Sequence, residues 1–497
     1  MTGPRPMVIV SLPARTVSEA VPQIAEARAA GADAAEVRFD RWTPDERGRA
    51  ADLFPSSLPL VATLRSKQEG GGGPDAALER LRELTALARL PFRWIDLEFG
   101  RDEEVVARLP PVERLGRIFS SHLPASRSSD WSRRWIELSA VSGIGKLVLP
   151  APVPFALGEM LPRLLEPRND PVVVHTTGPS GPLLRALARR IGSPMVFAAL
   201  PTGDGRPPVE ASQIPVDRLR PFLEAEGEPP LYGVAGRPIA HSQSPAIHSA
   251  WMRADGRVGL YLPLEFADEP EFLVSLPLLA ANGFRGLNVT HPFKGAAFEA
   301  ATEATPSARA CGAANCLTFR DGDVLAENTD LAAILRRLAE LRIAGTWDGR
   351  SLRVLGAGGA ARATLAAART LSVEATVFAR RPEQSRSLAT EFGATAGDDS
   401  SAPASLVVHA TAAGRTGGGP LDPALTAAIP GATHLLDWVY RPDEAWLRDA
   451  ARASNATYED GWRLFVYQAA ASYSLWWGEE PPVDRVEQAV AEGGCAG

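Results

Sequence analysis

The sequence has little cysteine, no large excess of charge and no long apolar run. Its three cysteines, Cys311, Cys316 and Cys495, are too few and too unevenly spaced for a disulfide framework or a zinc site. The net charge of −7 offers no basic footprint for nucleic acid. No apolar run approaches the roughly 20 residues that span a bilayer, and residues 1–17 lack the pattern of a signal peptide. We therefore expect a cytoplasmic protein with no metal site and no nucleic-acid or membrane partner.

The chain is long enough for several domains. Its 497 residues predict two or three of them. The stretch EAEGEPP at 224–230 is short, acidic and rich in proline, so it predicts a linker. We expect the domains to span residues 1–225, 231–335 (completed by C-terminal helices at about 461–485) and 345–460.

Residues 1–225 alternate short apolar runs with segments of helical periodicity. The runs that read as strands are MVIVSL (7–12), AAEVRF (34–39), LPLVATL (58–64), RWIDLEF (93–99), GRIFSSH (116–122), GKLVL (145–149), PVVVH (171–175) and PMVFAAL (194–200). Eight strand–helix repeats within about 220 residues predict a compact (β/α)₈ TIM barrel. A doubly wound open sheet is the alternative, although it does not call for eight repeats.

Polar residues recur at the ends of these strands, where barrels carry their chemistry. They are Glu36, Arg38, Arg65, Glu98, His122, Lys146 and Arg185. Each has an ordinary explanation, such as an ion pair, a satisfied core histidine or a lysine whose charged end reaches water. Their shared location instead favours a site for an anionic substrate. There the arginines suppress the charge of a buried Lys146, whose neutral amine can attack a carbonyl. The four glycines at 70–73 predict a flexible loop.

Residues 7–222 resemble type I 3-dehydroquinate dehydratase. The motifs EVRFD, TLRSKQEGG, DLE, SSH, the strand lysine, GPSGPLLR and SQI follow the family's order. The resemblance implies that Lys146 forms an imine with the substrate's C3 ketone and that His122 is the acid and base, oriented by Glu98. It assigns the substrate's hydroxyls and carboxylate to Glu36, Arg38, Arg65, Arg185 and Gln213.

Two departures from this family are visible. The loop after the eighth strand reads Val-Glu-Ala-Ser-Gln at 209–213, where the family has Ser-Ala-Pro-Gly-Gln. Val209 thus replaces a serine that contacts substrate, which predicts weaker substrate binding. Leu184 also replaces the family's serine before Arg185.

Beyond residue 230 the pattern changes. LYGVAG (231–236), LYLPLEF (260–266) and FRGLNVT (284–290) read as strands of a βαβ unit. NCLTFRDGDVLAENTD (315–330) reads as a hairpin that turns at Asp321-Gly322. SLRVLGAGGAARATLAAART (351–370) reads as strand, glycine turn and helix, which predicts a Rossmann-type unit.

Two groups of polar residues in this half suggest chemistry. Ser242 and Ser244 lie at the start of an expected helix, where hydroxyls and backbone amides suit a carboxylate. Lys294 starts another helix after the strand FRGLNVT, and Asp330 follows the hairpin. Each could be a helix cap or a solvated charge, but together Lys294 and Asp330 offer an acid/base pair.

A dinucleotide motif follows. GAGGAA at 356–361 fits G-x-G-x-x-A between a strand and a helix, which assigns cofactor binding to Gly356, Gly358, Gly359 and Ala360. About twenty residues on, an acidic residue would bind the ribose of NAD. The chain instead has Arg380, Arg381 and Arg386, which favour the additional phosphate of NADP.

Residues 231 to about 480 resemble shikimate dehydrogenase. The motifs are HSQSP, NVTHPFK, GAANCL, NTD, GAGGAARA, DWVYRP and DGWRLFVYQAA. The resemblance implies that Ser242 and Ser244 bind the substrate carboxylate and that Lys294 and Asp330 are catalytic. It places around the substrate's hydroxyls Thr290, Asn315, Tyr440 and Gln468. The departures are His409 for asparagine, Cys316 for threonine, Ala379-Arg380-Arg381 for Asn-Arg-Thr, and an alanine in place of the glycine that commonly follows NTD; none removes a catalytic group.

Together the two resemblances imply a bifunctional enzyme similar to the plant fusions. It would dehydrate 3-dehydroquinate to 3-dehydroshikimate and reduce that product to shikimate with NADPH. One alternative is a quinate/shikimate dehydrogenase working oxidatively in the second half, although the basic segment 379–386 argues against NAD. Another is a metabolite-sensing regulator built from the same domains. A regulator has no need of Lys146, His122, Lys294 and Asp330, which are all present.

Overall fold

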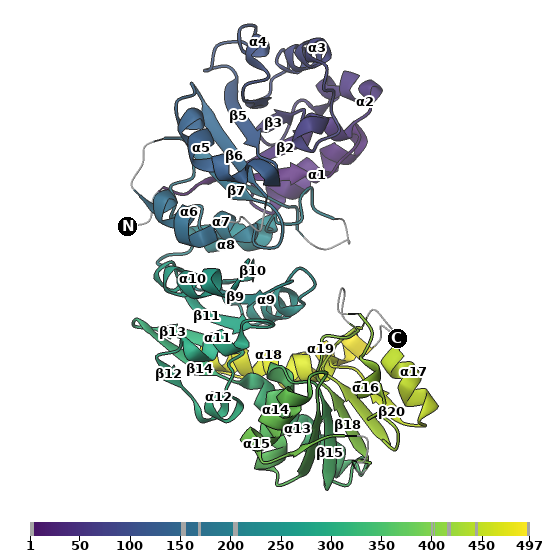
Figure 1. The fold of residues 1–497 in the computed structure, drawn as a ribbon. Coiled ribbons are helices and arrows are strands. Elements are labelled where there is room, and N and C mark those ends of the chain that lie inside the picture. Colours follow the sequence, from purple (N-terminus) through teal and green to yellow (C-terminus); the bar gives the residue numbers. More distant parts are fainter. Residues whose placement is uncertain are drawn as a thin grey trace. The chain divides into compact units, whose positions relative to one another are not determined.

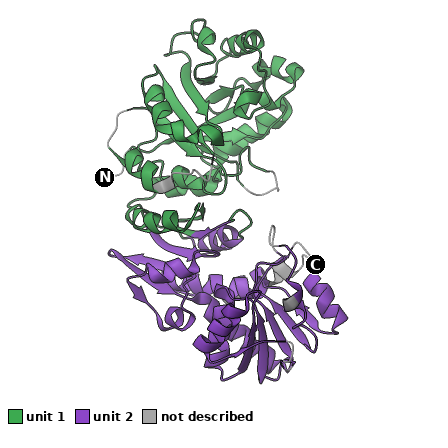
Figure 2. Ribbon diagram, in the orientation of Figure 1, with its two compact units in different colours: residues 1–233, 238–242, 257–283 green, residues 234–237, 243–256, 284–497 purple. Residues whose placement is uncertain are grey.

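The computed structural model describes residues 4–150, 156–166, 170–201, 207–398, 401, 403–414, 419–442 and 446–494. Figure 2 shows two compact units. The first comprises residues 1–233, 238–242 and 257–283, and the second comprises 234–237, 243–256 and 284–497. The domain limits inferred from the sequence, including the linker at 224–230, stay predictions. Within the described ranges, no helix combines the length and apolar character needed to cross a membrane.

Eight parallel strands dominate the first unit (Figure 1). They are β1 (Met7–Leu12), β2 (Ala34–Arg38), β3 (Leu60–Thr63), β4 (Trp94–Glu98), β5 (Gly116–His122), β6 (Ile144–Leu149), β7 (Val172–Thr176) and β8 (Met195–Ala198). Their order in the sheet is β7-β6-β5-β4-β3-β2-β1-β8, so the last strand pairs with the first. The predicted eight-stranded, nearly closed barrel is confirmed.

Helices connect these strands, as a βα repeat requires. They are α1 (Val17–Ala29), α2 (Pro44–Gly48), α3 (Ala77–Leu87), α4 (Glu103–Val106), α5 (Trp131–Ser139), α6 (Ala156–Leu165), α7 (Pro182–Ala186) and α8 (Val216–Glu224). The first unit also contains β10 (Leu260–Glu265) and α10 (Glu269–Ala281). The Ser180 hydroxyl accepts a hydrogen bond from the Glu265 amide at 2.7 Å, which ties the loop after β7 to β10.

The barrel interior starts with an apolar layer. Its members come from successive strands and are Ile9, Ala34, Val61, Trp94, Ile118, Val173 and Met195, with Ile144 packed against them. Because side chains alternate along a strand, the residues two positions further on face the same interior. Those positions carry the polar residues described below, so the apolar layer forms the floor beneath them.

The second sheet has the strand order β10-β9-β11-β13-β14-β12. Its further members are β9 (Leu231–Gly236), β11 (Phe284–Val289), β12 (Glu303–Ala304), β13 (Cys316–Arg320) and β14 (Asp323–Glu327). β13 and β14 form the predicted hairpin, and φ is positive at both Asp321 and Gly322. This conformation is the one that a tight two-residue hairpin turn requires. Around this sheet lie α9 (Ser244–Ala254), α11 (Lys294–Glu299) and α12 (Pro306–Cys311).

The third sheet is parallel throughout, with the order β17-β16-β15-β18-β19-β20. Its strands are β15 (Ser351–Leu355), β16 (Glu374–Phe378), β17 (Thr395–Ala396), β18 (Leu406–His409), β19 (His434–Asp437) and β20 (Thr457–Glu459). The predicted strand–turn–helix is β15 followed by α14 (Gly359–Thr370). The other helices of this unit are α13 (Thr329–Ile343), α15 (Pro382–Phe392), α16 (Pro423–Thr426), α17 (Trp446–Ala453), α18 (Trp462–Trp477) and α19 (Val483–Gly494).

Candidate active sites

A buried polar layer lies above the apolar floor of the barrel. Its members are Ser11, Glu36, Thr63, Asp96, Ser120, Lys146 and His175. Lys146 is 3% exposed, and its Nζ donates to Asp96 Oδ2 at 2.8 Å. Glu36 Oε1 lies 3.8 Å from the same nitrogen. The stretch around Lys146 contains no acidic residue, and the neighbouring strands supply the two carboxylates that hold the ammonium in place.

Glu36 is the second anchor of this layer. It accepts hydrogen bonds from Ser11 at 2.5 Å and from Thr63 at 2.8 Å. Burial raises its pKa, but the positive charges of Lys146 and Arg38 outweigh burial and lower it to about 2. Arg38 itself forms a two-pronged ion pair with Asp40, at 2.7 and 2.8 Å. Glu36 therefore stays ionised as a fixed acceptor facing Lys146.

His122, at the end of β5, pairs with Glu69. Its Nδ1 lies 2.7 Å from Glu69 Oε2. Burial and the positive charges of Arg65 and Lys146 lower the pKa of His122 well below 6.5. Burial, with the neighbouring carboxylate of Glu98, raises the pKa of Glu69 to about 8. The imidazole is consequently neutral at neutral pH, held by the carboxyl group of Glu69.

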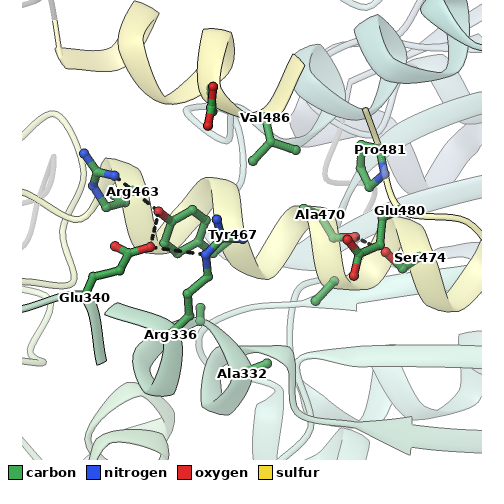
Figure 3. A pocket seen from close by; sticks show the side chains of 13 residues that line it. Ala332, Arg336, Glu340, Arg463, Tyr467, Ala470, Ser474, Glu480, Pro481 and Val486 are labelled. Atoms are coloured by element: carbon green, nitrogen blue, oxygen red, sulfur yellow. Dashed lines mark hydrogen bonds and ion pairs between the residues drawn. The ribbon is translucent and has the colours of Figure 1, made fainter. Parts of the chain in front are cut away.

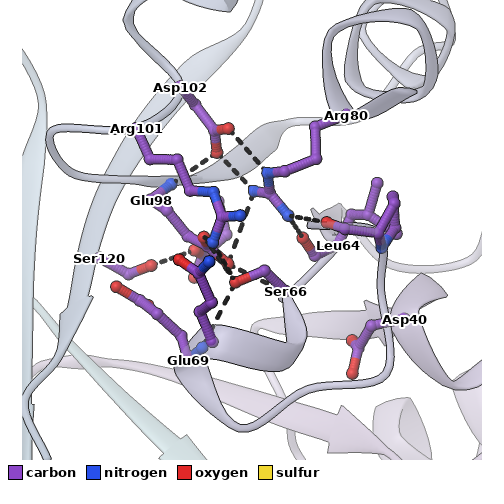
Figure 4. A network of polar contacts seen from close by, with 12 residues as sticks. Asp40, Leu64, Ser66, Glu69, Arg80, Glu98, Arg101, Asp102 and Ser120 are labelled. Carbon is purple, nitrogen blue, oxygen red and sulfur yellow. Dashed lines mark hydrogen bonds and ion pairs between the residues drawn. The ribbon is translucent and has the colours of Figure 1, made fainter. Parts of the chain in front are cut away.

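That Glu98 orients His122 stays a prediction; Figure 4 shows Glu98 in a polar network with Ser66, Arg101 and Asp102. Glu98 accepts hydrogen bonds from the Ser66 amide at 2.6 Å and the Ser66 hydroxyl at 2.9 Å. Its Oε2 lies 3.3 Å from Arg101 Nη1. Glu98 therefore fixes the loop that follows β3, and that loop carries Glu69. Sequence reasoning did not single out this loop carboxylate.

The glycine run at 70–73 is packed rather than open. The Gly73 amide donates to Arg65 O at 2.8 Å, and the Gly72 amide donates to Asp40 Oδ2 at 3.3 Å. A Cβ at Gly71 would lie 2.3 Å from Arg65 O, a distance that real side chains do not reach. The flexible loop stays a prediction, while Gly71, Gly72 and Gly73 allow a close approach to the backbone of Arg65 and Asp40. Their effect is to hold Arg65, whose pKa burial and Arg38 lower.

Arg185 and Gln213 complete the rim of the barrel site. Arg185 donates Nε to Phe197 O at 3.2 Å and Nη1 to Thr176 O at 2.7 Å and Gly181 O at 2.8 Å. Burial lowers its pKa to about 10. Gln213 Nε2 donates to Ser11 at 2.9 Å, whereas its Oε1 is buried with no partner among the described residues. An acceptor left in this way fits a ligand hydroxyl.

The second candidate site centres on Lys294 and Asp330. Lys294, at the start of α11, donates Nζ to Asp330 Oδ2 at 2.5 Å. Asp330, in the first turn of α13, accepts on Oδ1 from Asn315 Nδ2 at 2.8 Å. Asn315 also accepts from the Thr329 amide at 2.7 Å, and Gln468 Oε1 lies 3.5 Å from its Nδ2. The structure thus brings four residues predicted from separate motifs into one hydrogen-bonded chain.

The remaining predicted substrate residues lie on neighbouring elements. Ser244 is buried at the start of α9, and the Ser242 amide donates to Ile239 O at 2.9 Å. The Tyr440 hydroxyl accepts from the Gln243 amide at 3.4 Å, just before α9. Thr290 follows β11, and its hydroxyl has no partner among the residues that the structure describes. These placements leave the assignment of substrate contacts a proposal.

The dinucleotide turn fits a cofactor phosphate. Gly356 and Gly358 precede α14, which starts at Gly359 followed by Ala360. A Cβ at Gly359 would lie 2.7 Å from Lys294 Cδ, so any other residue here would displace the stem of Lys294. The amides at a helix N-terminus favour an anion. A pyrophosphate at this turn would therefore lie beside the Lys294–Asp330 pair.

Arg380 and Arg381 follow β16 and precede α15. Both are exposed, and Arg380 forms no ion pair or hydrogen bond within the described ranges. Arg381 has one weak contact, 4.0 Å to Glu383. These two guanidinium groups follow β16 and have few protein partners among the described residues. They are therefore suited to bind the 2′-phosphate of NADP.

His409 forms a chain that sequence reasoning missed. Its Nδ1 lies 2.7 Å from Asp437 Oδ1, and its Nε2 lies 2.6 Å from the Thr411 hydroxyl. Asp437 also accepts from the Tyr458 hydroxyl at 3.1 Å. His409 is fully buried at the carboxyl end of β18, so the chain fixes Thr411 next to the dinucleotide turn.

A separate cavity of about 700 Å³ lies between α13, α18 and α19 (Figure 3). Arg336, Glu340, Arg463 and Tyr467 line it and already engage one another. Tyr467 donates to Glu340 at 2.8 Å, and Arg463 donates to Tyr467 at 3.2 Å. None of the predicted site residues lines this cavity. It is therefore not part of the Lys294 site.

Asp96, Glu69 and Asp437 are the acidic partners that sequence reasoning did not single out. Asp96 could have been found, because it precedes Glu98 by two residues and so faces the same side of β4. Glu69 follows Arg65 by four residues within the quoted motif TLRSKQEGG. Asp437 carried no local signal, since its partner His409 lies 28 residues away on the next strand.

Comparison with known proteins agrees with both halves of the chain. Family models match for type I 3-dehydroquinase over residues 8–229, for the shikimate dehydrogenase substrate binding domain over 234–317 and for the shikimate 5'-dehydrogenase C-terminal domain over 461–491. Relatives from Acidiphilium cryptum and Gluconobacter oxydans are both called shikimate dehydrogenase (NADP(+)). They are 39% and 38% identical, and each match covers 52% of this chain and 94% of the relative.

Similar solved structures include shikimate 5-dehydrogenase from Thermus thermophilus in complex with NADP(H) and shikimate. It is 32% identical, covers 53% of this chain and 99% of its own, and has a TM-score of 0.46. The dehydroquinate dehydratase and shikimate dehydrogenase of S. pombe AroM covers 98% of both chains at 23% identity, with a TM-score of 0.44. The family models and curated relatives carry the identification: the chain belongs to the shikimate dehydrogenase family through its C-terminal half, and its N-terminal half is a type I 3-dehydroquinase domain.

Proposed function

We propose that this chain dehydrates 3-dehydroquinate in the barrel and reduces the resulting 3-dehydroshikimate to shikimate with NADPH in the second half. The observation that carries the proposal is that each half holds a lysine in direct contact with a carboxylate. Lys146 lies 2.8 Å from Asp96, and Lys294 lies 2.5 Å from Asp330. Lys146 and Asp96 fall in the matched range 8–229, and Lys294 falls in the matched range 234–317.

In the barrel, Lys146 is the nucleophile. Its deprotonated Nζ attacks the C3 ketone, and loss of water gives a protonated imine that withdraws electrons from C2. Neutral His122 removes the C2 proton and returns a proton to the leaving C1 hydroxyl. Water then hydrolyses the imine and releases 3-dehydroshikimate. Arg65 and Arg185 supply the positive charge that an anionic substrate needs, and Glu36 and Gln213 offer acceptors for its hydroxyls.

In the second site, NADPH held at the dinucleotide turn would supply a hydride to the C3 carbonyl. The oxygen that becomes an alkoxide takes its proton from Lys294, which Asp330 holds in position. Asn315 and Gln468 orient Asp330 and the substrate hydroxyls, while Ser242 and Ser244 bind the carboxylate. Arg380 and Arg381 bind the 2′-phosphate of the cofactor. We infer that the substrates are small molecules and that the enzyme acts in the cytoplasm, with no nucleic-acid or membrane partner.

The test uses the purified full chain with 3-dehydroquinate and NADPH, followed through formation of the enone and loss of NADPH absorbance. Both signals are expected, with shikimate as the product. Borohydride added with 3-dehydroquinate alone should then stop dehydration and leave a covalent adduct. The chain has only three lysines, Lys67, Lys146 and Lys294, so peptide mass mapping identifies the modified residue directly.

The expected adduct is on Lys146, and a Lys67→Ala variant should retain it. Active dehydration with an unmodified Lys146 would refute the imine mechanism. Consumption of quinate and NAD in preference to 3-dehydroshikimate and NADPH would replace the reductive assignment by the oxidative one.

A further inference from the structure

A carboxylate of the protein itself occupies the anion site of the barrel. Glu210 lies in the segment 209–213, which follows β8 and precedes α8. Its Oε2 lies 3.6 Å from Arg185 Nη2. The same oxygen accepts from the Ser212 amide at 3.1 Å and from the Ser212 hydroxyl. One carboxylate oxygen thus gathers the donors that would serve a bound anion.

The geometry of Arg185 leaves one direction for an anion. Its Nε and Nη1 are occupied by three backbone carbonyls, those of Phe197, Thr176 and Gly181. The guanidinium is therefore fixed, and its side chain is only 4% exposed. Nη2 is the nitrogen that remains for an anionic partner, and the partner it has is Glu210.

The contact with Glu210 is of a kind that can be displaced. The separation of 3.6 Å is longer than a direct charge-assisted hydrogen bond of about 2.7–2.9 Å. The Glu210 side chain is 31% exposed, so it can turn toward water without disturbing the barrel. Burial raises the pKa of Glu210 although Arg185 favours its charged form. Keeping the ionised carboxylate in this position is therefore less favourable than exposing it to water.

We propose that Glu210 is an internal competitor that occupies the anion site of Arg185 in the free enzyme and must leave when an anionic substrate binds. This inference rests on the proposed function, which gives Arg185 the substrate's carboxylate. Two carboxylates at one guanidinium repel each other, so binding of substrate requires the state in which Glu210 has turned away. A binding-competent state that is only partly populated weakens the apparent affinity by that fraction. Glu210 thereby raises KM without touching the chemistry at Lys146.

The test compares the wild type with Glu210→Ala and Glu210→Gln in steady-state dehydration of 3-dehydroquinate. The alanine variant removes the competitor, whereas the glutamine variant keeps its shape and removes its charge. Both should lower KM roughly 3- to 30-fold, with kcat within about twofold of the wild type. Glu79→Gln is the matched control, because Glu79 is exposed on α3 and the change in net charge is the same. Its KM should stay unchanged.

A second readout does not depend on turnover. Sodium sulfate should raise the melting temperature of Glu210→Ala at a lower concentration than it does for the wild type, because the variant leaves Arg185 open to an external anion. Unchanged or higher KM values in both variants, with kcat intact, would overturn the competitor role, as would identical responses to sulfate. A wild type without dehydratase activity would instead refute the proposed function, and sulfate binding would still decide the role of Glu210. A kcat for dehydration close to that of the wild type shows that the barrel of each variant is folded.

Discussion

The short contact between His122 and Glu69 decides the acid/base behaviour of the barrel. Glu69 is in a loop, but two hydrogen bonds from Ser66 of the same loop to Glu98 on β4 hold that loop in place. Oriented partners of this kind set which imidazole nitrogen carries the proton. Here Nδ1 faces Glu69, so Nε2 is the nitrogen left to act on substrate.

Replacing Glu69 should therefore slow dehydration more than it weakens binding. Glu69→Ala is expected to lower kcat roughly 10- to 100-fold with a small change in KM, since general acid–base catalysis is worth about 10²–10⁴-fold and an imidazole without its orienting partner loses part of it. Steady-state kinetics checks this, with Glu79→Gln as the control for a lost surface carboxylate. A variant with normal kcat would show that His122 needs no partner.

The pH profile gives an independent prediction. Because the pKa of His122 lies well below 6.5, the imidazole stays unprotonated, and able to accept a proton, down to pH values below 6.5. The acid limb of kcat/KM for dehydration should consequently lie below pH 6.5 rather than near it. Rate measurements between pH 5 and 9 decide the matter. An acid limb at or above pH 7 would mean that His122 is not held in this neutral state.

In the second site, Lys294 is the residue that donates a proton to the substrate. Lys294→Ala removes both the proton donor and the positive charge beside the developing alkoxide, so kcat for reduction should fall about 10²–10⁴-fold while KM for the substrate changes little. Stopped-flow or steady-state loss of NADPH measures the effect. The exposed Lys67→Ala variant serves as the matched control and should behave as the wild type. Near-normal reduction by Lys294→Ala would require another proton donor.

At the scale of single elements, the turn between β16 and α15 is expected to determine the preference for NADPH over NADH. Arg380 is exposed and has no partner among the described residues, so a 2′-phosphate is the group it can engage. Arg380→Ala should raise KM for NADPH roughly ten- to a hundredfold, the worth of about 1.5–3 kcal/mol for a hydrogen bond to a charged group. KM for NADH should change little. Arg452→Ala is the control, because the Arg452 side chain is exposed on α17. Equal effects on both cofactors would show that Arg380 does not bind the phosphate.

The packing of α9 against α18 gives a prediction about stability. His248 on α9 is buried against the rings of Trp251, Tyr473 and Trp476, and burial lowers its pKa from 6.5 to about 3. The unfolded chain binds a proton at this histidine below pH 6.5, whereas the folded chain does not bind it until about pH 3. This group therefore reduces stability progressively as the pH falls from 6.5 to about 3.

Between pH 6.5 and 4.5 this loss amounts to roughly 2–3 kcal/mol, because each pH unit is worth about 1.36 kcal/mol. Urea unfolding of the wild type and of His248→Leu at the two pH values measures it. The variant should lose about that much less stability, since all other titrating groups are shared. Equal losses in both proteins would show that the imidazole becomes protonated in the folded state.

Across the whole molecule, the local sequence pattern predicted the strands and helices better than it predicted which polar side chains contact one another. The eight barrel strands follow from short, nearly continuous apolar runs, because a strand of this barrel is buried on both faces. The Lys146–Asp96, His122–Glu69 and His409–Asp437 pairs join residues 50, 53 and 28 positions apart. Residues so far apart in the sequence come together only when the barrel or the parallel sheet forms. A short stretch of sequence therefore cannot reveal these pairs.

The two chemistries should be separable within the intact chain. The barrel site uses Lys146 and residues of the first unit, whereas Lys294, Asp330, Asn315 and Gln468 belong to the second. Lys146→Ala should therefore abolish dehydration and leave reduction of 3-dehydroshikimate unchanged, and Lys294→Ala should do the reverse. Each variant is the control for the folding of the other, since one activity survives in each.

Mixing the two variants tests whether the intermediate leaves the protein. If 3-dehydroshikimate dissociates into solution, molecules of Lys294→Ala produce it and molecules of Lys146→Ala reduce it. An equal mixture then contains each active site on half of the chains, so its steady-state conversion of 3-dehydroquinate to shikimate should reach about half the rate of the same total concentration of wild type. The measurement is shikimate formed per unit time after any lag. A mixture that makes no shikimate, although each variant retains its own activity, would mean that the intermediate passes between sites without release.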